Sequence, residues 1–252
     1  MTKLQKDFCI FATIMKKLVI IPTYNEIENI GRIIPAVFAL DGAFHILVID
    51  DGSPDGTAAA VKELQARDTQ DRLFLLERPG KLGLGTAYIT GFKWALERDY
   101  DYVFEMDADF SHAPSDLPRL LEACTIGGAD MSVGSRYCNG VSVVNWPIGR
   151  ILISYFASVY VRKVLKIKIY DSTAGFVCYS RKALGSIDLD AVRMRGYGFQ
   201  IEMKYTALKR GNRIAEVPVI FINRKEGTSK MSGSIFGEAF WGVIGLRLRK
   251  FN

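Results

Sequence analysis

Short apolar runs alternate with amphipathic stretches along the first half of the chain. The apolar runs are rich in Val, Ile, Leu and aromatic residues and predict buried strands: Leu18–Ile21, Phe44–Ile49, Leu73–Leu76 and Tyr102–Glu105. The other stretches predict helices: Ile27–Val37, Thr57–Gln65, Thr86–Arg98 and Ser115–Ala123. Asn25 and Glu28 have the spacing of a capping box, which predicts the start of the first helix. This alternation predicts an α/β fold, with a mostly parallel sheet covered by helices on both faces.

The second half of the chain is less regular. Its apolar runs predict strands and helices, with two short strands flanking Pro218: strands Met131–Gly134 and Thr173–Tyr179, helices Ile148–Val164, Gly196–Arg210 and Ile235–Phe251. The helix over Ile148–Val164 is mainly apolar, and we expect it to belong to the core rather than to a membrane surface. The last helix has apolar residues at helical spacing and ends in basic residues, so we expect it to be amphipathic.

Polar residues follow each predicted strand of the first half. The segments concerned are Pro22–Glu26, Asp50–Asp51, Lys81 and Asp107–Asp109. Ligands of open α/β sheets bind at the carboxyl ends of parallel strands, which meet at one edge. The sequence therefore predicts a functional site at this edge.

Asp107 and Asp109 end the apolar run 102–106 and are two positions apart. At the end of a strand, where the chain turns, both side chains can reach one bound ion. Two adjacent carboxylates repel each other unless a cation lies between them, and a hard divalent ion such as Mg²⁺ or Mn²⁺ suits oxygen ligands. The alternative is that both residues cap the following helix. The Asp107–Asp109 triplet alone does not separate these interpretations.

The composition narrows the classes of partner and compartment. The chain has 252 residues, of which 49% are hydrophobic, and a formal net charge of +6, which favours anionic partners. It has no block of consecutive basic residues, so we expect no nucleic-acid partner. Its four cysteines are scattered, which suits a reducing compartment and argues against structural zinc. The apolar stretch Ile151–Val161 lies between two arginines and is too short to span a bilayer.

Several motifs in the right order resemble the inverting nucleotide-sugar glycosyltransferases of family 2, which have the GT-A fold. They are Ile21–Glu26, Ile49–Thr57, Gly83–Ala87 and Asp107–Asp109. Gly196–Met203 and Arg224–Lys230 narrow the resemblance to the dolichyl- or polyprenyl-phosphate mannosyltransferases. The likeness runs from Met15 to about Met231, so we expect an extension over 1–14, a catalytic domain over 15–231 and a tail over 232–252. An NAD-dependent reductase is disfavoured because the first strand–helix turn lacks GxGxxG.

The resemblance assigns roles to individual residues. It implies that Asp107 and Asp109 bind the metal and that they carry the reaction together with Arg136 and Arg224. The residues that it implies for nucleotide, sugar, phosphate or metal contacts are Pro22, Tyr24, Glu26, Asp51, Lys81, Asp107, Ala108, Asp109, Arg136, Arg224 and Lys230. Some relatives have Gln as a further metal ligand where this chain has Ser111. Taken alone, Glu26 and Asp51 would also suit helix starts, and Arg224 and Lys230 a solvated surface.

The implied activity is transfer of mannose from GDP-mannose to a polyprenyl or dolichyl phosphate with inversion. A lipid phosphate is already anionic and needs no general base, so we expect His112 to be an ordinary loop histidine that is dispensable for activity. The alternatives are a transferase that uses another sugar nucleotide, such as UDP-glucose, on a lipid phosphate or a glycan, and a nucleotide-sugar-binding scaffold subunit. The physical properties of the residues do not distinguish which nucleotide base or which sugar the donor carries.

A lipid phosphate presents its head group at a membrane surface. We therefore expect the chain to be cytoplasmic and peripheral on the cytoplasmic face of the membrane, with the tail helix lying in the interface. Arg247, Arg249 and Lys250 would be attracted to anionic lipid. The alternative is that the tail folds back on the catalytic domain or pairs with another copy. Some relatives borrow a membrane-anchored subunit, which makes such a subunit a candidate partner.

Overall fold

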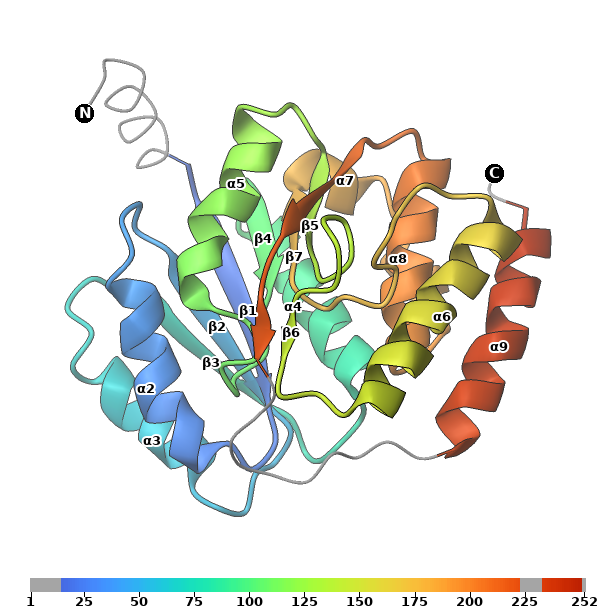
Figure 1. Ribbon diagram of the computed structural model, residues 1–252. Coiled ribbons are helices and arrows are strands. Elements are labelled where there is room, and N and C mark those ends of the chain that lie inside the picture. The colour runs from blue at the N-terminus through green and yellow to red at the C-terminus, as the bar shows by residue number, and fades with distance from the viewer. Residues whose placement is uncertain (1–14, 223–232, 251–252) are drawn as a thin grey trace.

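A seven-stranded sheet with the order β3-β2-β1-β4-β7-β5-β8 forms the centre of the computed structural model, which describes residues 15–222 and 233–250 (Figure 1). Its strands are β1 Lys17–Thr23, β2 His45–Asp50, β3 Leu73–Glu77, β4 Tyr102–Glu105, β5 Met131–Ser135, β7 Val177–Ser180 and β8 Ile214–Pro218. Strand β7 runs antiparallel to both of its neighbours, and the other pairs are parallel. Strands β6 (Val143–Val144) and β9 (Phe221–Ile222) form a separate small parallel sheet. The predicted mostly parallel sheet is confirmed.

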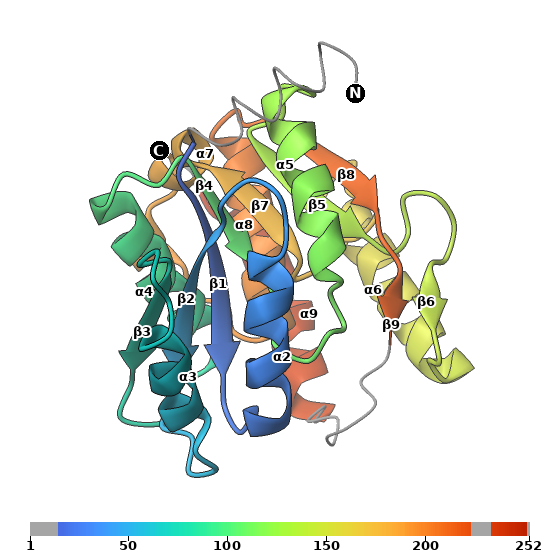
Figure 2. The ribbon, with the colours of Figure 1, turned by 90° about the vertical axis from the view of Figure 1, so that its left-hand side faces the viewer.

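Helices cover both faces of this sheet. They are α2 Ile27–Phe38, α3 Thr57–Gln65, α4 Leu84–Glu97, α5 Leu117–Thr125, α6 Ile148–Leu165, α7 Arg181–Gly185, α8 Tyr197–Lys209 and α9 Gly233–Leu248, with 3₁₀ turns over Pro114–Asp116 and Leu189–Ala191. Helices α2, α3 and α5 pack on one face, and α4, α7 and α8 on the other. Figure 2 shows α2 and α5 in front of the sheet, with α8 and α9 behind it.

Strand β1 shows why the sheet is buried on both faces. Val19 and Ile21 join the core with α2 and α5, whereas Leu18 and Ile20 join the core with α4 and α8. Successive side chains of a strand point to opposite faces, so a run without polar positions needs cover on both. The continuous apolar run that predicted this strand is therefore explained by the packing.

Two local predictions were wrong. Helix α2 begins at Ile27 without a side-chain cap, and Asn25 has a left-handed φ of 59°. The Ile27 amide instead donates to Asp55 Oδ2 at 3.1 Å, so the cap comes from the next strand–helix loop. The strand predicted over Thr173–Tyr179 begins only at Val177. The chain before it turns toward Arg136, whose Nη2 donates to Thr173 Oγ1 at 2.9 Å.

Helix α6 was expected to be core, and this is wrong for its first half. Ile148 is 75% exposed, Phe156 61% and Ile153 52%. Only the last turns are enclosed, where Val161 and Leu165 pack against α8 and α9. The apolar pattern is similar along the whole helix, but the neighbouring helices cover only its end.

Helix α9, the predicted tail helix, packs against α6 and α8. Val243 and Leu246 are buried there, and Tyr160 donates a hydrogen bond to the Phe240 carbonyl at 2.9 Å. Arg249, expected to face lipid, donates from Nη1 to Glu202 Oε1 at 2.6 Å. Trp241 stays 70% exposed. Helix α9 thus covers part of α6 and α8 and keeps an apolar residue at the surface.

The described helices include none with both the length and the apolar character needed to cross a bilayer. The expected extension over 1–14 and the basic residues Arg224 and Lys230 lie outside the described residues. The division into a catalytic domain over 15–231 and a tail over 232–252 remains a prediction.

Candidate active site

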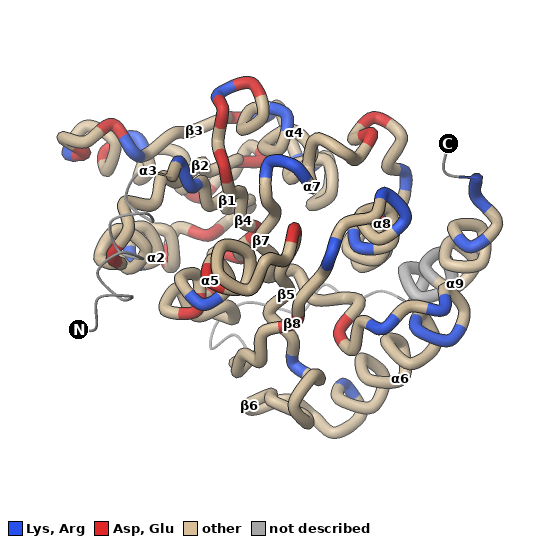
Figure 3. The backbone as a smooth tube through the Cα atoms, turned by 90° about the horizontal axis from the view of Figure 1, so that it is seen from above, with Lys and Arg blue, Asp and Glu red and all other residues tan. Residues whose placement is uncertain are grey.

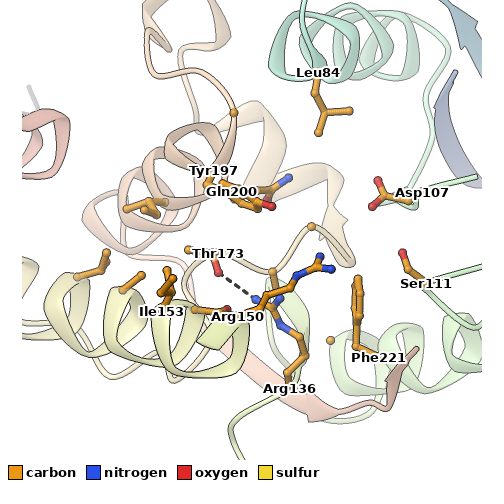
Figure 4. Close-up of a pocket in the computed structure, with 18 of the residues that line it drawn as sticks. Leu84, Asp107, Ser111, Arg136, Arg150, Ile153, Thr173, Tyr197, Gln200 and Phe221 are labelled. Atoms are coloured by element: carbon orange, nitrogen blue, oxygen red, sulfur yellow. Dashed lines mark hydrogen bonds between the residues drawn. The ribbon is translucent and has the colours of Figure 1, made fainter. Parts of the chain in front are cut away.

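A cavity of about 580 Å³ extends from the loop after β4 to the space between α6, α8 and α9. At one end its lining is polar and includes Asp107, Asp109 and Ser111. At the other end it is apolar: Ile153, Phe156, Ala157, Tyr160, Ile201 and Phe240. Figure 4 shows Arg136 and Arg150 between Asp107 and Ile153. The cavity therefore joins an acidic end and an apolar end through a basic middle.

The loop after β4 holds the two predicted metal-binding residues at the cavity. The Ser111 amide donates to Asp109 Oδ1 at 3.0 Å, and the Asp107 amide donates to His112 Nδ1 at 3.1 Å. Ser111 Oγ is buried and has no hydrogen-bond partner among the described residues. Two carboxylates and a hydroxyl give an oxygen donor set that suits Mg²⁺ or Mn²⁺. Residues 15–222 and 233–250 contain no group of three His, Cys, Asp or Glu side chains placed to hold a metal.

A buried polar network lies behind this loop. Glu105, at the end of β4, accepts hydrogen bonds from the Tyr179 hydroxyl at 2.8 Å and from the Gln200 amide. Lys204 donates to the Ala174 carbonyl at 2.6 Å and to Gln200 Oε1 at 3.3 Å. Burial raises the pKa of Glu105 to about 7 and lowers the pKa of Lys204 to about 8, while each group's charge opposes the other's shift. The network fixes the Gln200 amide at the cavity wall. In the sequence, Gln200 stands out only as part of the motif Gly196–Met203.

Arg136, a predicted phosphate contact, lines the cavity as half of a buried ion pair. Its Nε and Nη2 each donate to Asp171 at 2.6 Å, and its backbone amide donates to the same carboxylate at 2.9 Å. Burial alone would raise the pKa of Asp171, but the Arg136 charge and hydrogen bonds lower it. Arg136 Nη1 takes part in none of these hydrogen bonds. The Arg136 side chain is thus held rigidly, with one edge left for a ligand.

Arg150 and Ser154 also line the cavity, and neither was predicted from the sequence as a site residue. They are four positions apart on α6 and so share one side of the helix. The Arg150 guanidinium carbon lies 3.9 Å from the centroid of the Trp146 ring, a cation–π arrangement. In the sequence, Arg150 is one of the two arginines that flank the apolar stretch Ile151–Val161. The spacing of Arg150 and Ser154 was a usable signal.

The residues predicted to hold a nucleoside gather beside the cavity, at the carboxyl ends of β1, β2 and β3, and do not line it. Lys81 Nζ lies 4.8 Å from the centroid of the Tyr24 ring. Asp51 accepts from Arg78 Nε at 2.6 Å, and Arg78 Nη1 donates to the Thr86 hydroxyl at 2.8 Å. Arg78 was not foreseen, although it follows β3 as Asp51 follows β2.

Three other predicted contact residues have different surroundings. Pro22 is part of β1, and Glu26 accepts a hydrogen bond from the Asn29 amide at 2.9 Å. Ala108 is 3% exposed and packs in the core, so only its backbone can contact a ligand.

His112 differs most from its expected role. It lies in the loop after β4, but it is 4% exposed and lines the cavity. Burial lowers its pKa to about 4, so the imidazole is neutral near pH 7. The loop position is as expected, but the burial is not. Dispensability of His112 for activity stays a prediction.

Comparisons with known proteins agree with the sequence motifs. The family model described as Glycosyl transferase family 2 matches residues 18–187. The chain is 48% identical over 235 residues to the polyprenol monophosphomannose synthase of Mycolicibacterium smegmatis, covering 91% of this chain and 88% of that protein. It is 47% identical over 248 residues to the undecaprenyl-phosphate mannosyltransferase of Micrococcus luteus, covering 93% and 99%.

Among solved structures, the chain is similar to the glucosyl-3-phosphoglycerate synthase of Mycobacterium tuberculosis in complex with Mn²⁺, UDP-glucose and phosphoglyceric acid. The TM-score is 0.70 at 18% identity, with 96% of this chain and 84% of that chain covered. At this identity the likeness shows the fold alone, and it confirms the GT-A expectation. By its motifs, its fold and its curated relatives, the chain belongs to glycosyl transferase family 2.

Proposed function

We propose that this protein transfers mannose from GDP-mannose to a polyprenyl or dolichyl phosphate with inversion at the sugar. The observation that carries the proposal is the cavity that joins Asp107 and Asp109, through Arg136 and Arg150, to an apolar groove. The acidic end with a bound cation suits a nucleoside diphosphate, the basic middle suits a phosphate, and the apolar end suits a hydrocarbon chain. The two curated relatives, at 47% and 48% identity, are named for this type of reaction, and they support the choice of sugar and acceptor.

Asp107 and Asp109 would hold Mg²⁺ or Mn²⁺, with Ser111 Oγ as a further oxygen in the lining of the cavity. When bound, the ion would neutralise charge on the leaving diphosphate. Tyr88 lies beneath these carboxylates; burial first, and then the Asp107 charge, raises its pKa well above the usual value. Its phenol therefore stays protonated and adds no charge to the metal end of the cavity.

On the donor side, we propose that Tyr24, Lys81, Asp51 and Arg78 hold the nucleoside. The ion pair of Asp51 with Arg78 is nearly enclosed, because both side chains are only 9% exposed. Arg78 and Asp51 hold each other's side chain in place, so the carboxylate would meet a ligand in a fixed orientation. Arg224 and Lys230, implied by the resemblance as phosphate contacts, remain proposals.

On the acceptor side, we propose that Arg136, Arg150 and Ser154 bind the lipid phosphate. A phosphate monoester is anionic at neutral pH, so its oxygen can attack the sugar without losing a proton to a base. Among the described lining residues, the only histidine is His112. Burial lowers its pKa to about 4, so its imidazole is a weak proton acceptor, which suits a reaction that needs no base. The arginines would place the nucleophile and offset its charge.

The apolar end supports docking at the cytoplasmic face of a membrane. Exposed apolar side chains gather there on α6 and α9: Ile148, Leu152, Ile153, Phe156, Phe240 and Trp241. Figure 3 shows Lys and Arg along α6, α8 and the end of α9. An apolar surface edged by basic residues suits an anionic lipid interface. The described cysteines Cys124, Cys138 and Cys178 are free, in keeping with a reducing compartment.

A screen of donors against acceptors tests the proposed reaction. With Mg²⁺ or Mn²⁺ present, we expect GDP-mannose and a polyprenyl phosphate to give a mannosyl phospholipid that is labile to mild acid. UDP-glucose is the matched donor control, and a glycan with free hydroxyl groups is the acceptor control. Preference for UDP-glucose would show that the protein is instead the alternative transferase, which uses another sugar nucleotide. Glycosylation of hydroxyl groups alone would overturn the lipid-phosphate acceptor.

Substitutions on the exposed apolar surface test membrane docking. We expect Phe156→Ser with Trp241→Ser to weaken sedimentation with anionic liposomes by about tenfold, because roughly 1.4 kcal/mol of burial is lost with such large side chains. The KM for a long-chain lipid phosphate should rise, while the KM for the nucleotide sugar should not. Ile126→Ser is the matched control, since Ile126 is 57% exposed just after α5. Equal sedimentation of the double variant and the wild type would contradict this docking surface.

A further inference from the structure

His112 has a fixed orientation in the cavity wall. Its ring stacks on Phe176, with ring centroids 4.8 Å apart and planes inclined by 9°, and it meets the Phe221 ring edge-on at 5.5 Å. With 4% of the residue exposed, the ring has little space in which to turn. The two nitrogens of His112 therefore have separate and constant surroundings.

The surroundings of Nδ1 determine which nitrogen bears the proton. Nδ1 lies 3.1 Å from the backbone nitrogen of Asp107, and a backbone N–H can only donate. Nδ1 must therefore accept, and the imidazole carries its proton on Nε2. Nε2 makes no hydrogen bond with any residue in the described part of the chain. His112 thus has a proton donor in the wall of a cavity, and residues 15–222 and 233–250 provide no acceptor for it.

Gly175 leaves space next to this part of the ring. A Cβ placed on Gly175 would lie 3.9 Å from His112 Cε1 and 3.6 Å from Gln200 Nε2, and all three residues line the cavity. The Gln200 amide is fixed by Glu105 and Lys204. A small group of a ligand can therefore occupy the space over Gly175, between a histidine and an amide that are both held in place.

We propose that His112 is a binding residue whose Nε2–H donates a hydrogen bond to a phosphate oxygen lodged over Gly175. The inference rests on the proposed function and assigns a residue to its phosphate site. An anionic oxygen suits the position because the Phe221 ring that His112 meets also lies 5.6 Å from the Arg136 guanidinium carbon, and Arg150 lines the same cavity. A hydrogen bond to a charged acceptor is about twice as strong as one between neutral groups. The phosphate belongs either to the nucleotide or to the lipid.

Two substitutions separate the functions of the two ring nitrogens. In His112→Asn, the amide oxygen can still accept from the Asp107 N–H, but the donor at Nε2 is lost. In His112→Gln, the longer side chain can place an amide N–H near the former Nε2. We expect the KM of one phosphate substrate to rise about tenfold or more in His112→Asn, as loss of roughly 1.4 kcal/mol implies, and to rise less in His112→Gln. The substrate whose KM rises identifies the phosphate.

Gly175→Ala tests the space without changing the donor. Its added methyl group would meet only ordinary van der Waals contacts, so the fold should tolerate it. We expect it to raise the same KM as His112→Asn, with thermal unfolding close to that of the wild type. Unchanged KM values for both substrates in His112→Asn would overturn the proposal while leaving the proposed function intact.

Nitrogen NMR of the full chain gives a readout that does not need turnover. The chain has two histidines, and His45→Gln assigns the signals of the other. We expect His112 to be neutral and protonated on Nε2, and its Nε2–H signal to shift with either Mg²⁺ and GDP or a short-chain prenyl phosphate. A shift with a phosphate ligand supports this site even if the screen shows a different donor sugar. A proton on Nδ1, or no shift with either probe, would overturn it.

Discussion

Asp107→Asn and Asp109→Asn are each expected to lower the rate of sugar transfer by at least about a hundredfold, the usual cost of losing one stabilising contact to developing charge. Both residues line the polar end of the cavity, and each provides a carboxylate for the proposed cation. Asparagine keeps the size of the side chain but removes the negative charge on which divalent-ion binding depends. Initial rates with Mg²⁺ or Mn²⁺, before and after EDTA, measure the effect.

A surface aspartate provides the control. Asp190 pairs with Lys93, its side chain is 81% exposed, and Asp190→Asn should keep wild-type activity and metal dependence. In the wild type, EDTA should abolish transfer, and added Mg²⁺ or Mn²⁺ should restore it. Full activity in EDTA, or near-normal turnover of either active-site variant, would contradict the proposed metal bridge.

The sheet and the location of the site followed from the sequence because both depend on local patterns. A strand buried on both faces, such as β1, needs a run without polar residues, and that run is legible in sequence. The carboxyl ends of such runs mark the edge of the sheet where ligands bind. The residues that follow these ends include Asp51, Lys81, Asp107 and Asp109. Among the described strands of the main sheet, all but β7 then run in the same direction around these residues.

Partners that are distant in the sequence could not be found in this way. Arg136 pairs with Asp171, which is 35 residues away, and Glu105 bonds to Gln200, which is 95 residues away. Asp171 does not differ locally from a surface polar residue, and the motif Gly196–Met203, which contains Gln200, does not show that Gln200 is bonded to Glu105. Their functions arise only when β7 and α8 pack beside β4 and β5.

The sequence also does not show which part of a helix or loop is buried by neighbouring elements. Helix α6 is apolar in both halves, but only the end with Val161 and Leu165 meets α8 and α9. His112 shows the reverse case, since a polar residue in a loop is usually solvated, and here Phe176 and Phe221 enclose it. Pattern gives the type of element, whereas burial depends on which other elements lie against it.

Arg136→Met is expected to remove most transfer activity and also to destabilise the fold. Arg136 provides the proposed phosphate contact, and its loss would leave Asp171, which is 0% exposed, without its charge partner. Breaking a buried ion pair on one side costs about 3–5 kcal/mol of the free energy of unfolding. Activity alone would therefore not separate substrate binding from stability.

The double variant Arg136→Met with Asp171→Asn separates them. Because neither partner is then left as an unpaired charge, we expect most of the free energy of unfolding to return, measured by urea denaturation. Transfer should stay at the level of Arg136→Met, since the guanidinium that meets the phosphate is still absent. Recovery of transfer together with stability would show that Arg136 only supports the fold.

Acid titration of stability gives an independent check on the same pair. The pKa of Asp171 is lowered in the folded protein, so the folded state binds fewer protons there than the unfolded state does. Its contribution to stability is therefore complete above the ordinary aspartate pKa of about 3.9 and is lost as the pH falls through the lowered value. We expect the double variant to lose less stability than the wild type in this acid range. An equal loss in both proteins would mean that the ion pair of Arg136 with Asp171 does not lower the pKa of that carboxyl.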